Sequence, residues 1–186
     1  MHPSLFFRPG ALLSQPELSA ARIDGVLIEV GEGYMPPDLP EDAGARATSL
    51  TPIVPDGYAL CGPTAAWVHG VRDAPPSCHH LQRISPRRPR ISPARNVVVH
   101  ERLIGADEFE FIAGMPVTTP LRTLTDLVLE SRGGAETDRW MRSLAAAAPA
   151  LVPQVHALLA ARERMPGKRA ALARLTDLAG YDEVTR

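Results

Sequence analysis

The spacing of hydrophobic positions divides the chain into three parts. From residue 119 onward, apolar side chains recur every three or four positions, which predicts amphipathic helices. Thr119 and Pro120 are typical of a helix start, because a threonine hydroxyl caps free amide groups and proline fits the first turn. Further helices are expected at 137–147, 153–164 and 167–179. We therefore predict a helical layer between residues 119 and 180.

The middle of the chain has the pattern of β-strands. Short alternating or β-branched runs occur at 79–84, 96–102 and 108–112, and Gly114 marks a turn into another such run. The arginine- and proline-rich stretch 85–94 is predicted to be a loop between two strands, because proline favours extended backbone and excludes helix. Residues 75–118 are therefore expected to form a β-rich region.

The first part of the chain is predicted to be a small unit of its own. A short helix at 16–23 is followed by Gly25–Pro36, where β-branched and aromatic residues flank a glycine-containing turn and predict a hairpin. An acidic, proline-rich stretch at 36–42 follows this unit. Short helices are expected after it, at 42–50 and 63–69.

The length of the chain fits one medium domain beside a small one. With 186 residues, of which 45% are hydrophobic and 22% charged, the composition is that of a globular protein. The presence of only two cysteines excludes a disulfide-rich secreted scaffold. We expect an α+β fold with a unit at 1–40 and a domain at 41–186, which combines a mixed sheet at 75–118 with helices at 119–180.

No stretch has the features of an export signal or a membrane span. The apolar start of the chain is interrupted at Arg8-Pro9-Gly10. The alanine-rich stretch 144–161 contains Pro149 and Pro153, and alanine contributes little transfer free energy into a bilayer. The protein is therefore expected in the cytoplasm, without contact with a membrane.

A net charge of −1 conceals an uneven distribution of charge. Residues 1–60 carry three arginines and eight acidic residues, whereas residues 61–100 carry six arginines and Asp73 as the single acid. No acidic residue occurs between residues 74 and 100. The arginines of this acid-free stretch are Arg83, Arg87, Arg88, Arg90 and Arg95.

Residues 83–95, the basic segment, are the candidate nucleic-acid contact. Arginine presents a planar fork of donors that fits phosphate or guanine, and several arginines without acids produce a local positive field. The lack of interleaved aromatic residues favours contact with the backbone of double-stranded DNA over stacking on single strands. The alternative is a solvated loop whose charges offset the acidic N-terminal unit through a contact between the two.

The residues needed for several kinds of catalysis are missing. Lys168 is the only lysine; it lacks the glycine pattern of a phosphate-binding loop. Pro166 stands where a restriction-type nuclease core would need an acidic residue. No serine occurs in a G-x-S-x-G motif. We therefore expect a protein that is not an enzyme.

The cysteine and histidine pattern does not favour a metal centre. Cys61 and Cys78 are seventeen positions apart, whereas structural zinc sites use close cysteine pairs. Cys78 and His79 are adjacent, so their side chains point to opposite faces of a strand. Neither a metal nor another cofactor is expected, and His69 is interpreted as a cap at the end of a helix.

Thr119, Arg122 and Asp126 form a predicted polar cluster at the start of the helical layer. Arg122 and Asp126 are four positions apart and share a helix face, so they can form an ion pair. Thr119 caps the same helix. Because buried polar groups must be paired, we favour a structural role, in which the cluster fixes this helix against the sheet, over a catalytic one.

Three segments resemble a known protein family. Residues 62–70 contain Thr-Ala-Ala-Trp-Val-His-Gly, similar to an S-A-A-x-x-H-G helix, and residues 114–127 follow a G-x-P-V-T-x-P-x-R-T-x-x-D-L pattern. The hairpin at 25–36 resembles the wing of a small winged helix. Together these segments resemble the actinobacterial branch of the AbiE-type (AbiEi-like) antitoxins, the regulator half of type IV toxin–antitoxin pairs.

The resemblance implies a reduced winged-helix unit at 1–40, followed by an antitoxin domain at 41–186. It further implies a bacterial, cytoplasmic transcriptional regulator that binds double-stranded DNA at the operator of its own operon. A nucleotidyltransferase-like toxin is the second partner that the resemblance implies. Some relatives carry a Vsr-like nuclease after the helical part, which this chain, ending at Arg186, is expected to lack.

The hairpin departs from the family pattern, because wings that contact DNA phosphates are rich in arginine. Here the hairpin carries Glu29 and Glu32, and the preceding helix offers only Arg22, which stays a candidate DNA contact beside the basic segment. One alternative is a protein-interaction module that has lost DNA binding, which Glu29 and Glu32 facing solvent would favour. Another alternative is an orphaned recognition domain of a nuclease fusion.

Overall fold

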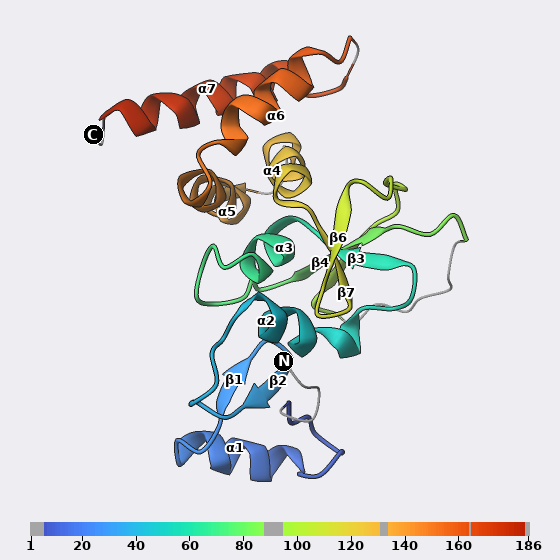
Figure 1. Ribbon diagram of the computed structural model, residues 1–186, viewed down its shortest axis with the longest axis vertical. Helices are drawn as coiled ribbons and strands as arrows, with labels where there is room; N and C mark the ends of the chain where they lie inside the picture. Colours follow the sequence, from blue (N-terminus) through green and yellow to red (C-terminus); the bar gives the residue numbers. More distant parts are fainter. Residues whose placement is uncertain (1–5, 88–94, 131–133, 164, 185–186) are drawn as a thin grey trace.

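The computed structural model describes residues 6–87, 95–130, 134–163 and 165–184. A five-stranded sheet lies at the centre of the molecule (Figure 1). The first helix and a two-stranded hairpin lie on one side of it, and the helices α4 to α7, which end the chain, lie on the other. The α+β fold class predicted from the sequence is confirmed.

The central sheet has the strand order β5-β4-β3-β7-β6. Its strands are β3 (Tyr58–Leu60), β4 (His79–Arg83), β5 (Val97–His100), β6 (Phe109–Ile112) and β7 (Met115–Thr118). β3 pairs in parallel with β7 and β4 pairs in parallel with β5, whereas the pairs β3–β4 and β6–β7 are antiparallel. The sheet is therefore mixed, as expected.

The middle strand, β3, is an element that the sequence pattern did not predict. Its three residues, Tyr58, Ala59 and Leu60, are all completely buried. A strand that is covered on both faces shows no alternation of polar and apolar positions, and three residues are too few to reveal a period. β3 nevertheless joins the two halves of the sheet, because β4 and β7 pair with it from either side.

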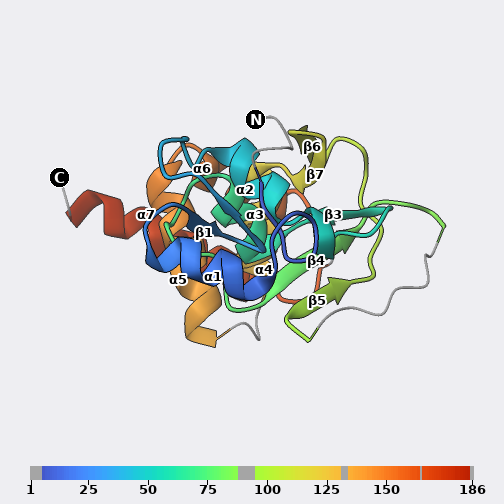
Figure 2. The same cartoon turned by 90° about the horizontal axis from the view of Figure 1, so that it is seen from below.

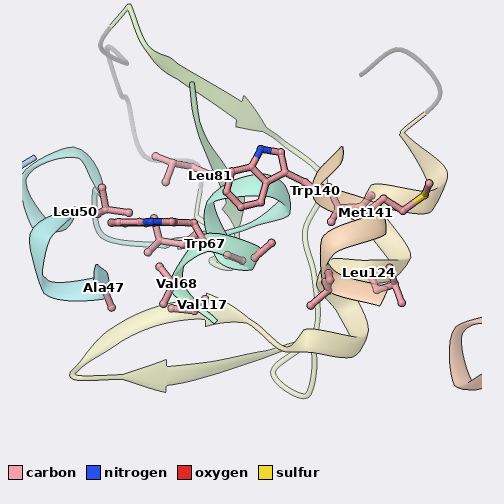
Figure 3. Packing of buried hydrophobic residues seen from close by; sticks show 14 of the residues in the cluster. Ala47, Leu50, Trp67, Val68, Leu81, Val117, Leu124, Trp140 and Met141 are labelled. Carbon is pink, nitrogen blue, oxygen red and sulfur yellow. The ribbon is translucent and has the colours of Figure 1, made fainter. Parts of the chain in front are cut away.

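The main hydrophobic core includes α3 (Gly62–Val68) and the sheet, and it continues into α2 (Ala43–Ser49) and the helical layer. Every residue of α3 is buried, and Trp67 is completely enclosed. Figure 3 shows Leu50 and Leu81 near the Trp67 side chain, and Val68 between Trp67 and Val117. The indole nitrogen of Trp67 donates to the backbone oxygen of Asp73 at 3.1 Å, so its one polar group is satisfied in the core.

The helical layer follows the sheet. Its helices are α4 (Pro120–Leu129), α5 (Gly134–Ala147), α6 (Leu151–Ala160) and α7 (Lys168–Val184). α4 contacts α3 and the other three helices of the layer, so it joins the layer to the sheet. In the described residues no single helix is long and apolar enough to cross a membrane; α5 and α6 together have the length and composition but are bent by 116°. α5 and α7 lie on one side of the molecule, and β3, β4 and β5 on the other (Figure 2).

The N-terminal unit consists of α1 (Gln15–Ile23) and a hairpin of β1 (Ile28–Val30) and β2 (Gly33–Met35). Ser14 and Glu17 form a capping box at the start of α1. α2 (Ala43–Ser49) and the short helix η2 (Thr51–Ile53) lead from this unit to the sheet. A helix followed by a hairpin is the arrangement predicted for a reduced winged-helix unit.

The N-terminal unit has a small core and also shares the main one. Leu18, Leu27 and Tyr34 form a buried cluster between α1 and the hairpin. Val30 and Met35, also from the hairpin, are buried in the main cluster with the residues of α2 and α3. The division of the chain into domains near residue 40 stays a prediction.

Candidate nucleic-acid interface

The basic segment leaves the sheet at β4 and re-enters it at β5. Because these two strands are parallel, Arg87 follows the C-terminal end of β4, whereas Arg95 precedes the N-terminal end of β5. β5 is also an edge strand of the sheet. The described ends of the connection lie on the side of the molecule away from α5 and α7 (Figures 1 and 2). The described end at Arg95 therefore adjoins an edge strand of the sheet.

The candidate arginines of the basic segment differ in exposure. Arg87 and Arg95 are exposed. Arg83, the last residue of β4, is half-buried, and its buried Nε has no hydrogen-bond partner among the described residues. Arg88 and Arg90 lie outside the described residues. The structure thus places Arg83 and Arg87 at one end of the connection and Arg95 at the other.

Arg22 lies apart from the basic segment. It belongs to the last turn of α1, where its Nε is 3.8 Å from Glu29 Oε2. The two side chains are 50% and 56% exposed, so this ion pair contributes little to stability. In both views α1 and the ends of the segment occupy different parts of the molecule (Figures 1 and 2). The structure therefore does not group Arg22 with the other candidate arginines.

The two glutamates of the hairpin have different surroundings. Glu29 is exposed, whereas Glu32 Oε1 accepts a hydrogen bond from Asn96 Nδ2 at 3.1 Å and lies 3.6 Å from His79 Nε2. Burial lowers the pKa of His79 although Glu32 acts to raise it, so the imidazole is mainly neutral at pH 7. The protein-interaction alternative would be favoured by both glutamates facing solvent. Only Glu29 is exposed.

The predicted polar cluster joins α4 to the loop before β6. Thr119 caps α4, since its hydroxyl accepts a hydrogen bond from the backbone N–H of Arg122 at 3.3 Å. Arg122 Nε donates to both carboxylate oxygens of Asp126 at 2.8 Å. Arg122 Nη1 also donates to Glu108. One guanidinium therefore holds carboxylates from its own helix and from the loop beside the sheet.

The charges of this cluster depend on one another. Burial disfavours the charged form of Arg122, but hydrogen bonds and attraction from Asp126 and Glu108 outweigh it and raise the pKa of Arg122. Burial also raises the pKa of Asp126, although Arg122 acts against this shift. For Glu108, burial acts in the same direction, yet hydrogen bonds from Gly105 and Arg122 outweigh it and lower the pKa. Asp126 is thus the carboxylate that most needs Arg122 to remain charged.

Two histidines on neighbouring strands stack on each other. His80 Nδ1 lies 3.1 Å from His100 Nε2, and the ring centroids are 5.4 Å apart. Burial, together with the charge of His100, lowers the pKa of His80 to about 4. His69, at the end of α3, contacts the Thr118 carbonyl oxygen at 2.8 Å and so ties α3 to β7. Within the part of the chain that the structure describes, no three histidine, cysteine or acidic side chains are grouped as metal ligands.

The sequence from the middle strand of the sheet to the last helix matches a known family. The family is described as the AbiEi antitoxin C-terminal domain, and the match covers residues 58–181, which is more than half of the chain. The chain belongs to the AbiEi antitoxin family. The family indicated by the residue motifs is therefore confirmed, and the protein is antitoxin-like.

The assignment to the family depends on the AbiEi match, because the other comparisons add no family. No curated protein matches the chain. A solved structure that resembles it is the crystal structure of the RV2827C protein from Mycobacterium tuberculosis. The two sequences are 17% identical, the TM-score is 0.38, and the similarity covers 86% of this chain and 69% of that one.

The matched AbiEi domain contains both the basic segment and the polar cluster, whereas α1 and the hairpin precede it. Two residues that organise this site, Glu108 and Asn96, were not indicated by the sequence. Their partners, Arg122 and Glu32, are 14 and 64 positions away, so no local spacing links them. A contact of this kind becomes visible only when the sheet order is known.

Proposed function

We propose that this chain is a DNA-binding regulator of a toxin–antitoxin operon, and that the basic segment contacts double-stranded operator DNA. The observation that carries the proposal is the concentration of arginine without any acidic residue between positions 74 and 100, inside the AbiEi antitoxin domain. The exposure of Arg87, beyond the end of β4, and of Arg95, before the edge strand β5, supports it. Arginine forks bind phosphate, and the release of counterions from DNA supplies much of the affinity.

The proposed interface is centred on the basic segment rather than on the hairpin. A wing that enters a DNA groove needs a cationic tip. The tip of this hairpin carries Glu32, whose carboxylate contacts Asn96 within the molecule. Arg22 has Glu29 beside it, which reduces its attraction for phosphate, so Arg22 is at most a peripheral contact.

Membership of an antitoxin family implies a toxin as a further partner. We propose a nucleotidyltransferase-like toxin encoded in the same bacterial operon, and a cytoplasmic location for both proteins.

AbiEi antitoxin domains are typically non-enzymatic, and we propose that this chain acts by binding alone. The N-terminal unit is acidic, and the exposure of its Glu17 and Glu29 supports contact with a basic protein as a second function.

Fluorescence anisotropy tests DNA binding directly. The purified protein is titrated with the duplex upstream of its own gene and with a scrambled duplex of equal length. Tighter binding of the upstream duplex supports a regulator, whereas equal binding of both indicates backbone contact without sequence readout. No binding of either duplex at low salt would contradict the proposal.

A pair of double variants tests the proposed interface. Arg87→Ala/Arg95→Ala removes two exposed arginines of the basic segment, and Arg139→Ala/Arg169→Ala removes two exposed arginines of α5 and α7. Both double variants change the net charge equally. The first should weaken binding by at least about tenfold, since each lost phosphate contact removes attraction and counterion release. Equal effects of the two double variants would remove the basic segment from the interface.

A further inference from the structure

The turn of the hairpin is packed against α2. Gly31 has a φ of +55°, and a Cβ at this position would lie 2.2 Å from Ser49 Oγ and 3.2 Å from Leu50 Cδ2. Ser49 is itself buried and donates to the Arg46 carbonyl oxygen at 2.7 Å. The backbone of the turn therefore approaches the end of α2 too closely for a side chain, and this contact fixes the position of the next residue, Glu32.

Glu32 reaches from this fixed turn to the point where β4 and β5 begin. Its Oε1 accepts the hydrogen bond from Asn96 Nδ2 at 3.1 Å. The backbone oxygen of Asn96 accepts a hydrogen bond from the His79 N–H at 2.7 Å, and His79 is the first residue of β4. Asn96 thus connects three elements, the hairpin, β4 and the entry to β5.

Asn96 directly follows Arg95, the last residue of the basic segment. We propose that Glu32 is a positioning residue for DNA binding: it holds Asn96 and thereby fixes the backbone that carries Arg95. This inference rests on the proposed function, because it assigns the basic segment to DNA. It gives the acidic hairpin a role in DNA binding without any contact between the hairpin and DNA.

Removal of Glu32 should change the DNA affinity in the direction opposite to that expected from its charge alone. An acidic residue near a phosphate-binding arginine lowers the local positive potential, so its removal ordinarily strengthens DNA binding. If Glu32 positions the basic segment, its removal must weaken binding instead. Glu29 lies on the same hairpin, has the same charge and is exposed, so Glu29→Ala is a matched control.

The binding test compares Glu32→Ala, Glu32→Gln and Glu29→Ala with the unaltered protein, using the upstream duplex in an anisotropy titration. Glu32→Ala should weaken binding by about fivefold, the order of effect expected from one lost hydrogen bond. Glu32→Gln keeps an acceptor for Asn96 and should retain the affinity of the unaltered protein or exceed it. Glu29→Ala should bind equally well or more tightly. Tighter binding by Glu32→Ala would overturn the proposal.

A second readout needs no DNA. Trypsin cleaves after arginine, and the bond between Arg95 and Asn96 is held at one end by the contact with Glu32. Cleavage at this bond should be a few times faster in Glu32→Ala than in Glu29→Ala, at a protease concentration where both proteins remain folded. Equal rates would overturn the positioning role. Failure of the unaltered protein to bind DNA would contradict the proposed function. The cleavage rate would still show whether Glu32 holds the chain at Asn96 and Arg95.

Discussion

The hairpin contacts Asn96, the residue that follows the basic segment, yet the hairpin and the segment differ in charge and exposure. The hairpin carries Glu29 and Glu32 in the most acidic part of the chain, whereas the basic segment belongs to a stretch without acids. The hairpin resembles a wing in its sequence, but its tip is packed against α2 and Glu32 is hydrogen-bonded to Asn96. The ends of the basic segment present Arg87 and Arg95 to solvent. Shape alone therefore does not identify a DNA-binding element, because charge and internal contacts decide what a surface can bind.

Removal of Arg122 should have the largest effect on stability. Arg122 joins α4 to the loop before β6, in the domain that carries the basic segment. Arg122→Met leaves the buried carboxylate of Asp126 without its partner. We expect a loss of about 3 kcal/mol in the free energy of unfolding, measured by urea denaturation at pH 7. The loss should shrink at lower pH, because burial raises the pKa of Asp126 and protonation removes its unpaired charge.

Arg139→Met is the control for this prediction. Arg139 is an exposed arginine of α5, and its replacement should change the free energy of unfolding by less than about 0.5 kcal/mol. An Arg122→Met protein as stable as the Arg139→Met protein would show that the polar cluster does not support the domain.

A side chain at Gly31 should force the hairpin away from α2. Gly31→Ala combines the cost of a left-handed backbone with a collision at Ser49 Oγ, and should destabilise the protein by about 2 kcal/mol. Gly25→Ala is the control, because Gly25 also has a positive φ, of +75°, but no atom within 4 Å of the added Cβ. Its cost should be about 1 kcal/mol. Thermal or urea unfolding that gives equal losses would contradict the packed position of the turn.

Acid should destabilise the sheet through His80. The folded protein holds the pKa of His80 at about 4, below the ordinary 6.5, so the unfolded chain binds a proton first as the pH falls. The stability linked to His80 is fully present above pH 6.5 and is lost between pH 6.5 and 4. We expect a loss of about 1–2 kcal/mol between pH 7 and pH 5, measured by urea denaturation at each pH.

His80→Phe and Glu32→Gln identify the source of this pH dependence. His80→Phe removes one titrating group and should flatten part of the curve between pH 7 and pH 5. The rest of the slope comes from His79, whose pKa burial also lowers. Glu32→Gln removes the carboxylate that acts to raise the pKa of His79, so it should leave the slope in place or make it steeper. If Glu32→Gln flattened the curve instead, the acid-sensitive contact would lie between the hairpin and the sheet.

Replacement of Arg22 and of Arg95 should change the DNA affinity by different amounts, both smaller than the effects above. Arg95→Ala removes an exposed arginine of the basic segment and should weaken DNA binding by about threefold at moderate salt. Arg22→Ala removes an arginine that already has Glu29 beside it, and its effect should stay within about twofold. Anisotropy titrations of both variants at one salt concentration compare them. An effect of Arg22→Ala larger than that of Arg95→Ala would return the hairpin unit to the interface.

Elements with local signals could be predicted from the sequence. The glycine-containing turn predicted the hairpin, and Thr119 with Pro120 predicted the start of α4, because each signal lies within a few residues of the element it specifies. β3 was missed because three buried residues have no period. The sequence also indicated that Arg122 and Asp126 could pair, since they are four positions apart.

The contacts that organise the candidate site could not be predicted in the same way. Glu108 joins Arg122, and Glu32 joins Asn96, only because the sheet brings distant segments together. The charge of the basic segment is plain in the sequence, but the support that the hairpin gives to Asn96 is not. Charge composition is a property of a segment, whereas such support depends on the order and register of the strands.

The salt dependence of DNA binding tests the central claim most directly. The affinity for the upstream duplex is measured at several salt concentrations for the unaltered protein and for Arg87→Ala/Arg95→Ala. Each phosphate contact contributes about 0.9 to the slope of log affinity against log salt, so the double variant should lose roughly two units of slope. Equal slopes for the two proteins, or no binding at low salt, would contradict the claim that the basic segment binds DNA.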